Sequence, residues 1–159
     1  MTMPSRVASL AIFATLVFAG CGHPSEVRLR RSFGDHEAEY TRLLTMARED
    51  RELTRIAPTF TVAHGSGPSM DGHGITRERW NEYRRLFKVV GAKDGLTQDE
   101  DACSFTVSAE GLAVHGSAKG IIYSRKKPVP IMSSVDSWHG VGVAYSHIKN
   151  DWYVFYQRD

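Results

Sequence analysis

Residues 141–156, VGVAYSHIKNDWYVFY, carry the clearest structural signal in this sequence. The segments Val141–Ile148 and Trp152–Tyr156 are rich in β-branched and aromatic residues, and Asn150-Asp151 between them is a common turn pair. We therefore predict an antiparallel hairpin here, with bulky side chains on both faces of its second strand.

More strands are predicted immediately before this hairpin. Apolar and polar side chains alternate from Phe105 to Ala109, which is the period of a half-buried strand. Glu110-Gly111 allows a reversal of the chain, after which a second strand begins at Leu112. A third strand, or the continuation of the second, contains Ile121 and Tyr123.

A first helical segment is predicted at residues 36–56. Its apolar side chains recur at spacings of three and four residues, beginning with Tyr40 and Leu43. Pro58 stops the helix, and a short strand is predicted at residues 59–63.

A second helix follows a glycine-rich loop at residues 64–74. Thr76 is a suitable N-cap, and Gly91 closes the helix at its other end. One buried stripe is expected along it, formed by Trp80, Tyr83, Phe87 and Val90.

Helices that precede antiparallel strands are typical of the α+β class. We predict N-terminal helices packed on one face of a four- to five-stranded antiparallel sheet. With 159 residues, of which 42% are hydrophobic, the chain can build one core. The predicted organisation is a signal peptide at residues 1–20, a tether at residues 21–34 and a single globular domain at residues 35–159.

The predicted signal peptide has a short positive head and a short apolar body. Arg6 is the only charged residue before Glu26, and Val7–Ala19 contains only two polar side chains. A membrane-spanning helix needs about 20 apolar residues. The shorter stretch therefore indicates an export signal rather than a span.

Phe18-Ala19-Gly20-Cys21 resembles the lipobox of bacterial lipoproteins, in which small residues precede a cysteine. The resemblance implies cleavage after Gly20, attachment of diacylglycerol to Cys21 and acylation of the new amino terminus. Residue 22 is Gly rather than the Asp that favours inner-membrane retention, which implies the outer membrane, facing the periplasm. The alternative is an ordinary secretory signal cut after Ala19.

The cysteine count and the charge limit the remaining chemistry. If Cys21 carries lipid, Cys103 has no partner in the same chain, and we expect a buried thiol on a strand. The net charge of +2 becomes +1 without Arg6, so bulk charge indicates no class of partner. The tether at residues 21–34 is locally basic and suits anionic headgroups, although a solvated linker is the commoner case.

Two surfaces are candidates for binding a partner. One is the basic face of the helix at residues 76–91, for which the alternative is a solvated face balanced by Glu78 and Glu82. The other is the aromatic C-terminal strand with the loop before it; one face of this strand must be core, and the alternative for the second face is that a helix covers it. In an exported protein the basic face suggests lipid headgroups, the cell wall or an acidic envelope protein rather than nucleic acid. The predicted contact residues are Arg77, Arg84, Arg85, Lys88, Trp138 and Trp152.

No motif identifies a catalytic or metal site, and no cofactor is predicted. His64, Asp71 and His73 suit metal ligands, but HExxH and CxxC are absent and solvated loop residues explain them better. A hydrolytic triad would need a nucleophile elbow, GxSxG, which is also absent. Residues that would serve a hydrolase if the fold gathered them are His115, His139, His147, Glu110, Asp136, Ser133, Ser134 and Ser137.

The sequence therefore predicts an envelope lipoprotein with a non-catalytic domain that binds another envelope component, as immunity, exclusion and envelope-maintenance proteins do. The alternative is a small envelope hydrolase or a lipid-binding pocket protein. A deep pocket lined by the histidines and Asp136 would favour chemistry. A flat basic or aromatic face would favour a partner.

Overall fold

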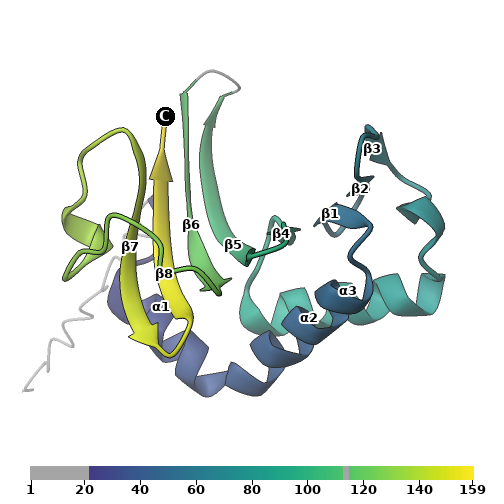
Figure 1. The fold of residues 1–159 in the computed structure, drawn as a ribbon, viewed down its shortest axis with the longest axis horizontal. Coiled ribbons are helices and arrows are strands. Elements are labelled where there is room, and N and C mark those ends of the chain that lie inside the picture. The colour runs from purple at the N-terminus through teal and green to yellow at the C-terminus, as the bar shows by residue number, and fades with distance from the viewer. Residues whose placement is uncertain (1–21, 113–114) are drawn as a thin grey trace, which may run out of the picture.

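The computed structural model describes residues 22–112 and 115–159. The predicted signal peptide and Cys21 lie outside these residues. The described chain forms three α-helices and one eight-stranded antiparallel sheet, which is the α+β class that the sequence predicts (Figure 1).

The helices are α1 (Glu26–Asp35), α2 (Glu37–Glu49) and α3 (Arg77–Val90). The predicted bounds of α3 are confirmed, because the Thr76 side chain caps its first turn and Gly91, with φ of 73°, ends it. Figure 1 shows the helices along one side of the strands.

The sheet is larger than the four or five strands predicted. Its strand order is β3-β2-β1-β4-β5-β6-β8-β7. Three of the four short strands were not predicted, and the fourth, Thr61–Ala63, confirms the short strand predicted at residues 59–63. All four have two to four residues each, which is too short to show a period of two. The strands are β1 (Leu53–Ile56), β2 (Thr61–Ala63), β3 (Pro68–Ser69), β4 (Leu96–Gln98), β5 (Ala102–Leu112), β6 (His115–Ser124), β7 (Gly142–Lys149) and β8 (Trp152–Arg158). Two 3-10 turns complete the described elements, η1 (Gly72–Gly74) and η2 (Val135–Ser137).

The predicted C-terminal hairpin is confirmed as β7 and β8, joined at Asn150-Asp151. The predicted reversal at Glu110-Gly111 is wrong, because both residues continue β5 and pair with β6. The predicted helix over residues 36–56 is also wrong in its last part, where Leu53–Ile56 is β1. The Gln98 side chain donates hydrogen bonds to carbonyls at the end of α2 and at Leu53, which helps to end the helix there.

Residues 26–34, predicted as part of the tether, belong to α1 and pack on the domain. Leu29 and Phe33 are 2% and 1% exposed. Among the described residues of the predicted tether, only residues 22–25 lie outside the helix, so the prediction of a tether is wrong for residues 26–34.

An aromatic cluster forms the centre of the core. The Trp152 ring lies 5.1 Å from that of Phe33 and 6.0 Å from that of Phe105, measured between centroids. Tyr40 and Tyr123 complete the cluster at 6.1 Å and 5.3 Å from Trp152. Cys103 on β5 is fully buried, as predicted, and burial raises the pKa of its thiol to about 12.

Candidate functional site

The six predicted contact residues fall into two groups, which are two tryptophans that pack on the core and four basic side chains on α3. Trp152 is 6% exposed and belongs to the core, so its assignment to a binding surface is wrong. Trp138 is half-buried and packs on the core as well, with an indole N–H that has no partner among the described residues. Their aromatic character did predict burial, but it does not distinguish a core from an interface.

The basic side chains of α3 stay at the surface. Arg77, Arg85 and Lys88 are exposed. Arg84 is half-buried, because its guanidinium stacks over Trp80 at 4.1 Å and donates a hydrogen bond of 2.6 Å to the carbonyl of Pro58. The predicted basic face is therefore present on α3, and the stacking and the hydrogen bond hold the side chain of Arg84 in place.

Two adjoining pockets lie at the C-terminal end of α3. The larger, of about 490 Å³, lies between this helix end, α1 and β5. The other, of about 410 Å³, lies between the last turns of α3 and Pro58. Because Gly91 and Lys93 line both pockets, they form one continuous surface. We call it the α3-end surface, and it comprises Arg28, Arg84, Lys88, Val89, Gly91 and Lys93.

The α3-end surface is both cationic and apolar. Arg28, Lys88 and Lys93 are exposed, and no Asp or Glu lines either pocket. The ion pairs within residues 22–112 and 115–159 use other cations, so these three charges are free to meet a partner. Val89 is 37% exposed between them. This combination suits an anionic partner that also has an apolar part.

The chain enters the domain beside this surface, where His23 is fixed to the sheet. Its two ring nitrogens are hydrogen-bonded to the hydroxyls of Ser108 on β5 (3.1 Å) and Ser117 on β6 (2.6 Å). The ring also packs edge-on against Tyr156, with 5.3 Å between centroids. The side chain is 10% exposed, so residue 23 is held firmly rather than solvated.

A buried carboxylate fixes the next turn of the chain. Glu26 is 4% exposed and accepts hydrogen bonds of 2.7 Å from the Arg30 guanidinium, the hydroxyls of Ser134 and Ser146, and the N–H of Val135. Burial opposes ionisation of Glu26, but the donors outweigh it and lower its pKa. These contacts join α1 to η2 and β7.

Asp136 holds the same region from the other side. Its carboxylate accepts the N–H of Glu26 at 3.0 and 3.1 Å and forms an ion pair with Lys119, which is 4% exposed. We call His23, Glu26, Lys119 and Asp136 the N-terminal clasp. No sequence signal identified it, since Glu26 and Asp136 are 110 residues apart.

Acidification is expected to weaken the clasp. Burial lowers the pKa of His23 below 6.5, against the attraction of Glu110, and the positive charge of Lys119 lowers it further. Between the pKa of His23 in the folded protein and 6.5, the unfolded chain binds more protons than the folded one. The free energy of unfolding therefore falls as the pH falls through this window. Urea unfolding at pH 7.5 and 5.5 should therefore show that the free energy of unfolding falls less between these two pH values for His23→Asn than for the unaltered protein. The exposed His139→Asn is the control, and equal losses in all three proteins would contradict the assignment.

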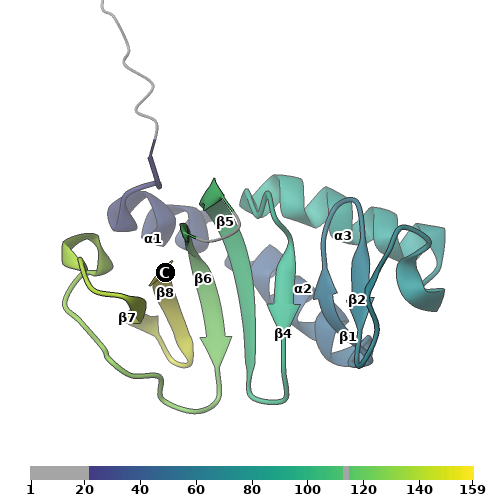
Figure 2. The ribbon, with the colours of Figure 1, turned by 90° about the horizontal axis from the view of Figure 1, so that it is seen from above.

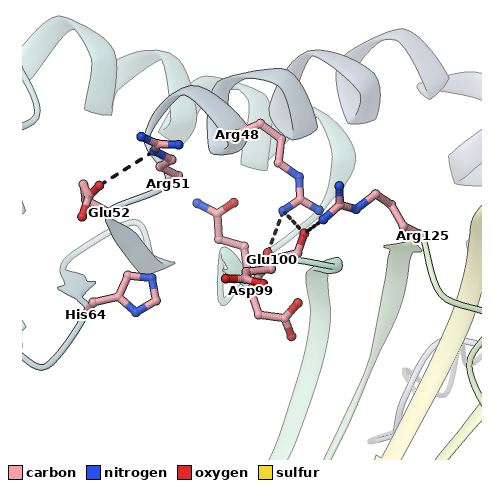
Figure 3. Close-up of a pocket in the computed structure, with 8 residues that line it drawn as sticks. Arg48, Arg51, Glu52, His64, Asp99, Glu100 and Arg125 are labelled. Carbon is pink, nitrogen blue, oxygen red and sulfur yellow. Dashed lines mark hydrogen bonds and ion pairs between the residues drawn. The ribbon is translucent and has the colours of Figure 1, made fainter.

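A further pocket, of about 400 Å³, is polar (Figure 3). Arg48 donates to the carbonyls of Asp99 and Glu100, and Arg125 donates to the same Glu100 carbonyl. His64 lies across the pocket and points toward it (Figure 3). Arg48 and Arg125 thus hold the turn between β4 and β5, which is a structural role.

The predicted catalytic and metal residues are not gathered into one site. His147 is hydrogen-bonded to the carbonyl of Asn150, and His73 to the hydroxyl of Thr61. No hydrogen bond or ion pair of the described chain joins His139 or His147 to Asp136. The side chain of His115 lies outside the described residues. No cluster of three or more possible metal ligands occurs within residues 22–112 and 115–159.

Glu110 and Asp136 do line one open pocket together with His23 and Lys119. The same four groups make the contacts of the clasp or lie at its edge, so they are engaged in holding the chain entry.

None of the helices in the described part of the chain has the length and apolar composition needed to cross a bilayer. No protein-family model, curated protein or solved structure matches the chain.

Proposed function

We propose that this chain is an envelope lipoprotein, anchored through lipid on Cys21, whose non-catalytic domain binds an anionic envelope component. The lipobox-like motif supports the anchor, and Gly22 supports an outer-membrane location facing the periplasm. The observation that carries the binding role is the α3-end surface, where Arg28, Lys88 and Lys93 line one mixed and one largely apolar pocket, neither of which contains a carboxylate.

The alternative is an envelope hydrolase, or a protein that encloses a lipid in a pocket. Hydrolysis by the predicted residues would need a histidine in contact with a carboxylate or a nucleophilic hydroxyl. Asp136 is instead bound by Lys119 and by the N–H of Glu26, and no hydrogen bond of the described chain joins it to His139 or His147. This engagement favours binding over chemistry.

Metabolic labelling with a palmitate analogue tests the anchor. The unaltered protein should carry the label and stay with the membranes in 0.5 M salt, whereas Cys21→Ala should lose the label and be released from the membranes by that salt. Cys103→Ala is the matched control, because it removes the only other cysteine, and it should keep the label. A Cys21→Ala protein that is still labelled and membrane-bound would refute the anchor.

Charge reversal tests the binding role. Lys88→Glu with Lys93→Glu should abolish the products, with lipid or with protein, that the protein forms when cross-linked in intact envelopes. Lys126→Glu with Lys127→Glu changes the same number of charges in the exposed segment after β6, and should leave the products unchanged. Identical products from both double variants would exclude the α3-end surface as the binding site.

A further inference from the structure

The N-terminal clasp determines how far the domain can lie from the membrane. Because His23 is fixed to β5 and β6, only Cys21 and Gly22 separate the proposed lipid from the folded domain. Two residues span about 7 Å when fully extended. The domain surface around His23 therefore lies within roughly one Debye length, about 10 Å, of the headgroups.

The surface that this short connection brings to the membrane is the α3-end surface. Gly22 and His23 line the same pocket as Arg28, Val89 and Lys93. Figure 2 shows α1 and α3 along one edge of the molecule, and the segment after β6 at the opposite edge. The chain thus leaves the domain beside this cationic surface, and also beside Glu110 and Asp136, of which Asp136 is paired with Lys119.

We propose that the α3-end surface docks on the anionic phospholipid headgroups of the membrane that holds the lipid on Cys21. This inference rests on the proposed anchor and names the anionic component bound by the domain. Arg28, Lys88 and Lys93 meet the phosphates, and the exposed Val89 reaches the boundary between headgroups and acyl chains. The domain then lies flat against its own membrane instead of projecting from it.

A fluorophore placed on either edge of the molecule tests this orientation. Val89→Cys places an environment-sensitive label on the docking surface, and Val129→Cys places it in the segment after β6, where residue 129 is 79% exposed. Cys103 is fully buried and does not compete for the label. In lipidated full-length protein on vesicles with phosphatidylglycerol, the label at 89 should shift to the blue, and the label at 129 should not. Pure phosphatidylcholine vesicles or 0.5 M salt should abolish the shift.

The outcomes separate the docking from the anchor. If the protein floats with the vesicles but the label at position 89 shows no shift, the docking is refuted and the anchor stands. If the lipid label is absent and the protein does not float, the anchor fails, and the docking proposal falls with it. Cross-linking from position 89 to an acidic protein, without any shift on anionic vesicles, would place a protein there instead and refute the docking.

The charge dependence is measured without the anchor, on Cys21→Ser protein and vesicles in excess. One cation near an anionic surface strengthens binding about five-fold. Lys88→Gln with Lys93→Gln should therefore lower the partition coefficient roughly 25-fold. Lys126→Gln with Lys127→Gln is the matched control and should change it less than two-fold. Equal losses in both double variants would show non-specific attraction and overturn the proposal.

Discussion

Trp152→Ala is expected to lower the free energy of unfolding by about 3–5 kcal/mol, because it empties the centre of the aromatic core. The Trp152 ring contacts four other aromatic rings from α1, α2, β5 and β6. Removing it leaves a cavity that elements joined by so many contacts cannot close fully. Urea unfolding, followed by circular dichroism, measures the loss.

Trp138→Ala is the control for this prediction. Trp138 is half-buried in the segment before β7, and we expect a smaller loss of about 1 kcal/mol. If Trp152→Ala left stability unchanged and removed only the binding of a partner, Trp152 would be an interface residue and the core described above would be wrong.

Glu26→Ala is expected to cost about 3 kcal/mol, because it leaves the donors around a buried carboxylate without an acceptor. The N–H of Val135 is buried, and the hydroxyl of Ser146 keeps only a long contact of 3.5 Å to the carbonyl of Ser133. Arg30 is 33% exposed and regains water, which holds the cost near the lower end of the range for a broken buried pair. The same urea titration measures this loss.

Glu37→Ala is the matched control. Glu37 also pairs with a cation, Lys149, at 2.7 Å, but both side chains are more than 40% exposed, and we expect a change below about 1 kcal/mol. A loss for Glu26→Ala as small as that for Glu37→Ala would mean that the clasp does not hold α1. The inferred distance between domain and membrane would then rest on the contacts of His23 alone.

The two largest errors of the sequence interpretation have a common cause. In α1 only Leu29 and Phe33 form an apolar stripe, and the other buried residue is the charged Glu26. Its burial is explained by Ser134 and Ser146, more than 100 residues away, so local periodicity does not reveal it. Likewise Leu53–Ile56 shows no strand pattern by itself and becomes β1 through its pairing with β2 and β4.

The sequence predicted only part of the α3-end surface, because some of its residues come together only in the folded chain. Lys88 and Arg84 follow from the polar side of one helix, which local spacing defines. Arg28 and Lys93 belong to other segments, and only the packing of α1 beside the end of α3 places them around the same pocket. Tryptophan is common in binding interfaces, but the residues that surround Trp152 in the folded chain bury it in the core.

By itself the sequence determined the features whose causes are local. These are the capped helix α3, the hairpin of β7 and β8 with its turn at Asn150-Asp151, and the α+β class. The tertiary structure alone decided the eight-strand sheet, the clasp that replaces a tether and the α3-end surface. The physical reason is that a cap or a turn is stabilised by residues a few positions apart. A buried carboxylate, a two-residue strand or a shared pocket depends on partners that only the folded chain brings together.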